Sequence, residues 1–356
     1  MSFAFEPGAK LAAREYVLLV SGTMNPPHIG HVRLGLRAAD ALRADGHRVH
    51  AVCYLPVHDN YLVNKIALKK EGRKEISAAD AFAVPMCERC EMLRSLIAAE
   101  ASAAQEYVCH VLDYEHTAGE EVLAESPGYW APRLPQGYLR TVPTTTLIAH
   151  FAAHSPLLAD GAARLAVVFG VDNLAGMSSW NAPDTLLQKA DVVLLARCAS
   201  SVQFGCEPSG LLGAVRHLEV RAAVPVKHAG TELFGAACGS FVNTAAASEG
   251  ALMLLPPLAG PDESLSSTAI RNAVAASAPP AASDGAAASS DGAAAASDEA
   301  AAACAATLAQ HGYASAAMQA QMAEASAGSA VALRAMHEAG VQRGDWVEPK
   351  EPCSVA

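Results

Sequence analysis

Six apolar runs of strand length alternate with helical stretches along this chain of 356 residues. The apolar runs lie near residues 16–20, 48–55, 107–112, 165–169, 191–196 and 252–255. The helical stretches lie near residues 30–45, 86–101, 143–153 and 183–190. Such alternation implies parallel strand pairing with right-handed crossovers. We therefore predict an α/β fold, a doubly wound, Rossmann-like parallel sheet with helices on both faces and ligands at the carboxyl ends of its strands.

The segment after the first apolar run has the layout of a phosphate-binding turn. It reads Ser21-Gly-Thr-Met-Asn-Pro-Pro-His-Ile-Gly-His31. Gly22 lets the backbone approach a ligand, and the following helix start offers backbone N–H groups and partial positive charge. His28 and His31 lie three residues apart, so they share one face of the first helical turn and can donate together to phosphoryl oxygens. The alternative is a capped helix with two surface histidines.

Two later segments have similar chemistry. Gly170-Val-Asp172 directly follows the run at 165–169, although a glycine and an aspartate after a strand also form ordinary turns. Farther on stands Ser264-Leu-Ser-Ser-Thr-Ala-Ile-Arg271. Ser266 or Ser267 can cap a helix there, and Arg271 lies one turn beyond Thr268. Hydroxyl and guanidinium can then hold one polyphosphate together.

These segments resemble motifs of the nucleotidylyltransferase superfamily. The first is similar to its G-x-F-x-P-x-H-x-G-H signature, with Met24 in place of the usual aromatic residue. Asn25 is typical of the branch that adenylylates pyridine mononucleotides. The third segment resembles the family's I-S-S-T-x-I-R sequence. The resemblance therefore implies a nicotinamide or nicotinate mononucleotide adenylyltransferase, a nucleotidyltransferase of NAD biosynthesis.

The second segment resembles the family's G-A-D-x-L…W block through Gly170, Asp172 and Trp180, and the next strand ends in Arg197 as the family's does. A weaker match, residues 55–61 with Lys65, Lys69 and Lys70 downstream, resembles a segment of the eukaryotic branch in which one lysine binds phosphate. Thr144 aligns with a nucleotide-contacting threonine. The resemblance covers about residues 14–274.

The resemblance also implies roles for individual residues. The expected catalytic residues are His28, His31 and Arg271. The expected ATP-binding residues are Gly22, Thr23, His28, His31, Ser267, Thr268, Ala269, Ile270 and Arg271. The mononucleotide or NAD is expected at Gly22, Thr23, Lys65, Thr144, Gly170, Asp172, Trp180 and Arg197. Mg²⁺ is expected as the cofactor, bound mainly through ATP phosphates, since the sequence offers no carboxylate cluster for a dedicated metal site.

Composition restricts the partners. A net charge of −11 disfavours nucleic acid, whose phosphates most of the surface would repel. No apolar run approaches the roughly 20 residues of a membrane helix. The N-terminus lacks a basic segment followed by an apolar one, so we expect a cytoplasmic or nuclear enzyme that acts on the small molecules ATP and nicotinamide or nicotinate mononucleotide. A homo-oligomer and the preference for amide or acid substrate stay open.

The composition changes after Val274. Large apolar side chains are absent between Ala275 and Thr307, where Ser-Asp-Gly-Ala repeats dominate. We predict a catalytic domain over residues 1–274, a disordered insertion over 275–306, and a helical extension with a tail over 307–356. Leu308-Ala-Gln-His-Gly-Tyr313 resembles the family's C-terminal H-x-L-Y ending, and residues 316–340 could form an Ala-rich helix.

Three alternatives share parts of this pattern. Another adenylyltransferase or cytidylyltransferase of the superfamily has the first motif without the Gly-x-Asp…Trp block. A class I aminoacyl-tRNA synthetase also carries His-Ile-Gly-His but needs a Lys-Met-Ser-Lys-Ser-type loop, which this sequence lacks. A non-catalytic nucleotide-binding or chaperone-like relative would keep the same histidines and Arg271.

Overall fold

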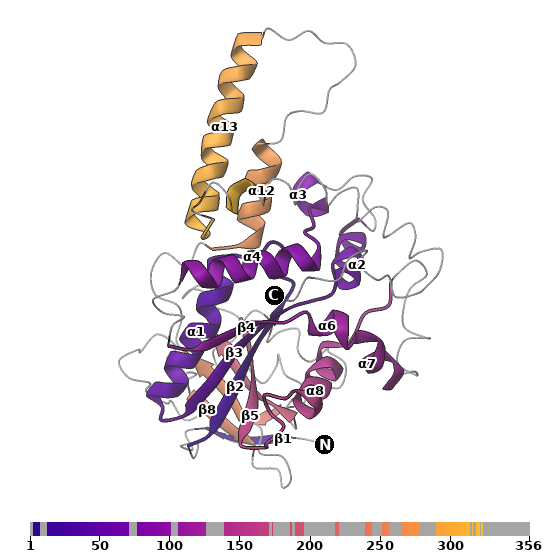
Figure 1. The fold of residues 1–356 in the computed structure, drawn as a ribbon, viewed down its shortest axis with the longest axis vertical. Coiled ribbons are helices and arrows are strands. Elements are labelled where there is room, and N and C mark those ends of the chain that lie inside the picture. Colours follow the sequence, from indigo (N-terminus) through magenta and orange to yellow (C-terminus); the bar gives the residue numbers. More distant parts are fainter. Residues whose placement is uncertain are drawn as a thin grey trace.

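A computed structural model describes most of the expected α/β region. The described residues are 3–7, 13–70, 77–100, 106–125, 139–170, 173, 186, 189–195, 218–220, 239–243, 251–255, 265–277, 290–313, 315, 318–320 and 322. Within these ranges one sheet has the strand order β4-β3-β2-β5-β6-β9-β8-β1-β7 (Figure 1). Its strands are β1 (Phe3–Pro7), β2 (Glu15–Gly22), β3 (Arg48–Pro56), β4 (Val108–Val111), β5 (Ala163–Gly170), β6 (Asp191–Leu195), β7 (Leu218–Val220), β8 (Gly239–Asn243) and β9 (Ala251–Leu255).

All six apolar runs predicted as strands are strands, and they are the contiguous part of the sheet from β4 to β9. Every neighbouring pair within this part is parallel. The parallel Rossmann-like α/β fold is therefore confirmed. Three further strands, β1, β7 and β8, were not predicted from the sequence. They extend the sheet beyond β9, with β8 antiparallel to both β9 and β1.

Helices cover both faces of the parallel region. The described helices are α1 (Ile29–Ala44), α2 (Asp59–Lys70), α3 (Ala78–Ala81), α4 (Met86–Ala99), α6 (Tyr114–Thr117), α7 (Gly119–Glu125), α8 (Thr144–His154), α12 (Ser267–Ser277) and α13 (Ser290–Gln310). One buried cluster joins one side of β2 and β3 to α1 and α4. A second cluster joins the opposite side to α7 and α8. Alternate residues of β2 belong to different clusters, as the period of a strand buried on both faces requires.

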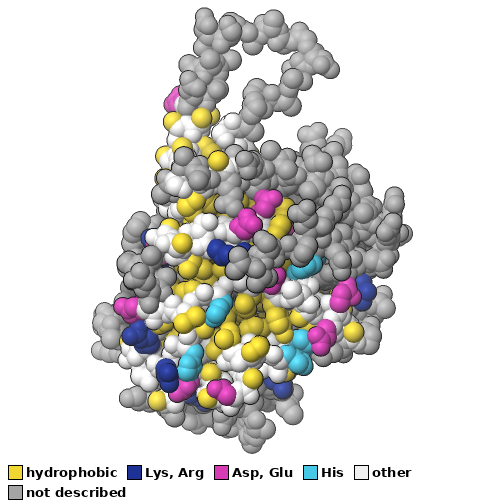
Figure 2. Space-filling model, in the orientation of Figure 1, with side chains coloured by type: hydrophobic (Ala, Val, Ile, Leu, Met, Phe, Trp, Pro, Cys, Tyr) yellow, Lys and Arg dark blue, Asp and Glu magenta, His cyan; other side chains and the backbone are white. Residues whose placement is uncertain are grey.

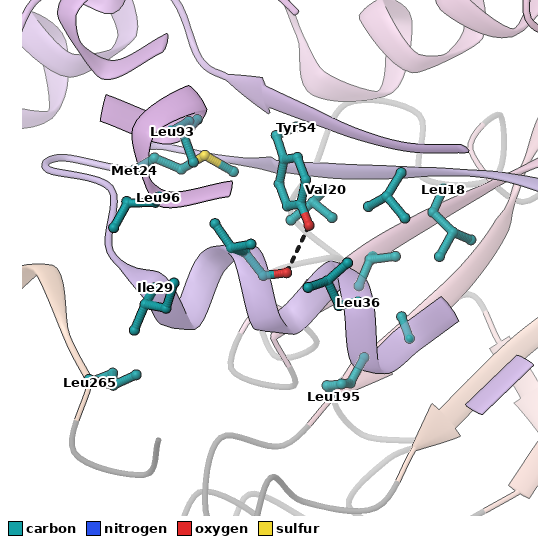
Figure 3. Packing of buried hydrophobic residues seen from close by; sticks show 14 of the residues in the cluster. Leu18, Val20, Met24, Ile29, Leu36, Tyr54, Leu93, Leu96, Leu195 and Leu265 are labelled. Atoms are coloured by element: carbon teal, nitrogen blue, oxygen red, sulfur yellow. Dashed lines mark hydrogen bonds between the residues drawn. The ribbon is translucent and has the colours of Figure 1, made fainter. Parts of the chain in front are cut away.

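The helix α1 packs closely on the sheet because it carries a glycine where the two surfaces meet. A Cβ atom added at Gly35 would lie 2.7 Å from Val52 Cγ1 and 2.8 Å from the Tyr54 hydroxyl oxygen. That hydroxyl donates to the Val32 carbonyl of α1 at 2.8 Å (Figure 3). These contacts hold α1 close against β3.

The C-terminal region differs from the predicted disordered insertion. α12 extends to Ser277, and α13 begins at Ser290, so residues 290–306 are helical. Alanine has the highest helix propensity, which accounts for a helix in a segment without large apolar groups. Near its end α13 buries Cys304 and Leu308 in the core. α13 lies beside α12 and projects from the body of the molecule (Figure 1).

Several predictions fall outside the described residues. They are the segment 278–289, the tail from 323 to 356, and most of the helical stretches at 183–190 and 316–340. Among the described residues, helices that could span a bilayer are absent. On the face in Figure 2, the described acidic and basic side chains are interspersed, with no large area of one sign.

Candidate functional site

A cavity of about 450 Å³ opens at the carboxyl ends of β2 and β5. These strands are neighbours in the sheet, whereas β3 lies on the other side of β2. The chain therefore reverses its direction across the sheet at this point, and open α/β sheets bind ligands in the crevice that results. The polar or glycine residues that line the cavity are Ser21, Gly22, Thr23, Asn25, His31, Tyr61, Lys65, Asp80, Thr144, Gly170, Asn173, Ser266, Ser267, Thr268 and Arg271.

A buried arginine binds the backbone of the turn after β2. Arg89 of α4 is 0% exposed and donates from Nη1 to the Thr23 carbonyl at 2.7 Å. It also donates to the Val57 carbonyl at 2.7 Å, to the Val84 carbonyl at 2.8 Å and to Asp59 Oδ1 at 2.8 Å. One planar guanidinium thus joins the ends of β2 and β3 to the segment before α4.

Asn25 connects this turn to the segment before α4. Its amide nitrogen donates to the Phe82 carbonyl at 2.9 Å, and its amide oxygen accepts from the Val84 N–H at 2.8 Å. The following bond, Asn25–Pro26, is cis, and Met24 has a φ of 46°. Both polar atoms of the Asn25 side chain therefore bind backbone groups of the protein.

The two histidines of the first motif have different environments. His31 lines the cavity. His28 is the N-cap residue of α1, is 3% exposed, and is not among the lining residues. Its backbone N–H donates to His31 Nδ1 at 3.0 Å, and the two ring centroids lie 3.8 Å apart. A Cβ at Gly30 would lie 2.9 Å from the His28 ring, so the glycine of this motif gives that ring its space.

The start of α12 lies against the turn that precedes α1. Ser266 caps α12, because its hydroxyl accepts from the Ala269 N–H at 3.0 Å. Ser267 donates from Oγ to the Pro26 carbonyl at 2.8 Å, across 241 residues of sequence. The predicted cap at Ser266 or Ser267 is thus provided by Ser266, while Ser267 joins the two motifs. The N-terminal ends of α1 and α12 consequently lie at the same cavity.

Arg271 lies on α12 one turn beyond Thr268 and lines the same cavity. It donates to Thr268 Oγ1 at 2.9 Å, which agrees with the predicted shared face. It also donates to the Asn25 carbonyl at 2.6 Å and the Ala79 carbonyl at 3.0 Å. Burial lowers the pKa of Arg271, and the nearby Asp80 carboxylate opposes that shift. Arg271 therefore connects α12, the β2 turn and α3 while it lines the cavity.

Most described residues of the predicted site come together here. Gly22, Thr23, His31, Lys65, Thr144, Gly170, Ser267, Thr268 and Arg271 all line the cavity. Of the three candidate lysines, Lys65 lines the cavity and donates to Thr23 Oγ1 at 3.3 Å. The side chains of Lys69 and Lys70 lie outside the described part of the chain.

Other predicted residues lie elsewhere. Ile270 is 0% exposed and packs in the core, and the Ala269 N–H is used by the Ser266 cap. Neither residue lines the cavity. Asp172, Trp180 and Arg197 lie outside the described residues.

Part of the cavity wall comes from residues that were not predicted from the sequence. Tyr61 and Phe82 give it aromatic surface, and Asp80 is the one acidic side chain among the described lining residues. No sequence pattern marked Asp80 or Phe82, because both lie outside the segments that resembled family motifs. The four hydrogen bonds of Arg89 depend on tertiary contacts, which a local pattern does not mark.

Comparisons with known proteins found similarity to solved structures at low sequence identity. Protein-family models give no match to the chain, and curated protein sequences give none either. The similar solved structures include two of Plasmodium falciparum nicotinic acid mononucleotide adenylyltransferase. The complex with NaAD has a TM-score of 0.40 and 11% identity, and covers 73% of this chain and 84% of that one. The complex with APC has a TM-score of 0.39 and 10% identity, and covers 76% and 86%.

Proposed function

We propose that this protein is a nicotinamide or nicotinate mononucleotide adenylyltransferase. It would transfer AMP from ATP to the 5′-phosphate of the mononucleotide and release pyrophosphate, giving NAD or its deamido form. The observation that carries the proposal is convergence. Segments at 21–31 and 266–271, which resemble two motifs of that family, meet at one cavity with Gly170 of the third. These segments are far apart in the sequence, so local structure alone does not bring them together.

The cavity wall carries side chains suited to the transfer of AMP from ATP to a phosphate group. The attacking phosphate oxygen is already anionic, so the reaction needs positioning and charge stabilisation rather than a protein nucleophile. In our proposal His31 contacts the α-phosphoryl group, and Arg271 with the start of α12 holds the β- and γ-phosphates. Three of the five N–H groups of a guanidinium are used by Ala79, Asn25 and Thr268, which leaves two for phosphate oxygens.

Other residues of the cavity wall suit the mononucleotide. Lys65 offers a charge for its phosphate, and Thr144 at the start of α8 offers a hydroxyl and a helix N-terminus. Tyr61 and Phe82 provide apolar surface for a planar ring. In our proposal Asp172, Trp180 and Arg197 complete this part of the site.

The described residues also fit a magnesium ion that is held mainly by ATP. Clusters of three or more ligating side chains are absent from the described residues. Asp80 supplies a single carboxylate on the Arg271 side of the cavity. Mg²⁺ commonly keeps several waters and takes one or two carboxylates besides phosphate oxygens. When bound, it would neutralise charge on the polyphosphate.

The direct test measures product formation by the purified chain. ATP, Mg²⁺ and either mononucleotide should yield NAD or deamido-NAD together with an equal amount of pyrophosphate. Transfer from CTP in place of ATP would favour a cytidylyltransferase. A folded sample that binds ATP but yields neither dinucleotide would contradict the proposal and favour the non-catalytic relative.

Variants of His31 test the assignment of its role. His31→Ala should lower kcat by about 10²-fold, the usual effect of a lost electrostatic donor, with little change in KM for ATP. His154→Ala is the matched control, because His154 lies exposed at the end of α8 and away from the cavity. Arg271→Lys should reduce both ATP binding and turnover less than Arg271→Ala does, since lysine keeps the charge without the planar fork. A normal kcat with a raised KM in His31→Ala would make His31 a binding residue.

A further inference from the structure

Residues 311–313, directly after α13, form a short segment that we call the closing segment. The His311 carbonyl accepts from the Ile29 N–H in the first turn of α1 at 2.9 Å. The His311 ring nitrogen Nε2 accepts from the Ser266 N–H, at the cap of α12, at 3.1 Å. A single residue therefore joins the two helix starts that face the cavity, although His311 does not line the cavity itself.

The hydrogen bonds of His311 fix the orientation and the protonation of its ring. Nδ1 lies 2.7 Å from the Thr307 carbonyl, which can only accept, so Nδ1 carries the proton. Nε2 then has a lone pair for the Ser266 N–H, and the ring is a neutral imidazole. His311 is 1% exposed, so the surrounding core holds this arrangement in place.

The rest of the closing segment packs beneath the turn that precedes α1. Gly312 has a φ of 101°, and a Cβ there would lie 2.7 Å from Leu96 Cδ2 and 2.9 Å from Ile29 Cβ. The Tyr313 hydroxyl donates to the Pro27 carbonyl, and Tyr313 is 0% exposed. The segment thus contacts the turn, α1 and α4, and it does so without reaching the ligand space.

We propose that His311 is a positioning residue that sets the distance between the start of α1 and the start of α12. This inference rests on the proposed function, in which His31 of α1 contacts the α-phosphoryl group while Thr268 and Arg271 of α12 hold the leaving pyrophosphate. One polyphosphate then spans both helix starts, and a shift of one helix by about 1 Å can cost about 10²-fold in rate. The last turns of α13 deliver His311 to this place.

Two conservative variants separate the hydrogen bond to the Ser266 N–H from the other hydrogen bond of the His311 ring, to the Thr307 carbonyl. His311→Asn places a donor near Nδ1 for the Thr307 carbonyl but is too short to reach the Ser266 N–H. His311→Gln places an amide oxygen near Nε2, where it can accept from that N–H. We expect His311→Asn to lower the affinity for ATP by about 10-fold and to lower kcat by about 10²-fold. We expect His311→Gln to stay within about 3-fold of the wild type in both, an amide oxygen being an adequate acceptor.

A stability control excludes a general structural effect. Tyr16→Phe removes one buried hydrogen bond, from the Tyr16 hydroxyl to Asp191 Oδ2, near the start of β2 and so at the end of the strand opposite to the cavity. It should lower Tm as much as His311→Asn does and leave ATP binding and kcat unchanged. The inference is overturned if His311→Asn and His311→Gln behave alike, or if His311→Asn alters only Tm.

ATP binding, measured by calorimetry, keeps the two proposals distinguishable. If the wild type binds ATP without forming dinucleotide, the proposed function fails, and the contrast between the two variants in ATP affinity still decides the role of His311. If the folded wild type does not bind ATP, both proposals fail.

Discussion

Replacing Arg89 should destabilise the protein strongly, because its guanidinium is buried and fully engaged with the core around the β2 turn. The Arg89 and Asp59 side chains are 0% and 3% exposed, and Nη2 lies 2.8 Å from Oδ1. Arg89→Met keeps much of the side-chain volume but leaves the Asp59 carboxylate buried without its cation. Removing one partner of a buried ion pair costs about 3–5 kcal/mol. Three backbone carbonyls lose their donor as well.

Urea unfolding followed by circular dichroism measures this loss. We expect Arg89→Met to lower the free energy of unfolding by about 3–5 kcal/mol, a large part of the roughly 5–15 kcal/mol of a typical protein. Arg43→Met is the matched control, since Arg43 pairs with Glu106 at 2.7 Å where both side chains are largely exposed. Its urea midpoint should change little, because exposed pairs contribute little.

A double-mutant cycle isolates the ion pair from the other hydrogen bonds. Asp59→Asn removes the buried negative charge, so the loss in Arg89→Met/Asp59→Asn should be smaller than the sum of the two single losses. Additive losses, or a loss below about 1 kcal/mol in Arg89→Met, would show that the buried pair does not stabilise the turn as argued.

Two further predictions concern burial and packing. Burial raises the pKa of Glu115 to about 8 from a usual 4.5, so the unfolded chain gives up this proton first as the pH rises. The wild type should therefore lose stability relative to Glu115→Gln between pH 4.5 and pH 8, and thermal unfolding that showed no such drift would contradict this. Gly35→Ala should lower the free energy of unfolding by about 1–3 kcal/mol, because the added methyl group overpacks against β3. This loss should exceed the gain in helix propensity of about 1 kcal/mol. An unchanged or higher Tm would refute this prediction.

Local patterns in the sequence were enough to predict the parallel core of the fold. The apolar runs that became β2, β3, β4, β5, β6 and β9 were identified because strands buried on both faces are nearly continuous apolar segments. The cap at the start of α12 was predictable for a similar reason, since capping depends on a few adjacent residues. β1, β7 and β8 were not predictable in this way, because they extend the sheet at its edge.

The sequence by itself determined which segments resemble phosphate-binding motifs and where the strands and helices beside them begin. Only the tertiary structure decided which side chains reach the cavity: it buries His28 beside His31 and brings Lys65 and Asp80 to the wall. It also decided that an Ala-rich segment is partly helical and delivers His311 between two helix starts. The physical reason is that helix caps and strand patterns depend on neighbouring residues. The position of a side chain relative to a distant helix depends on packing that no local pattern encodes.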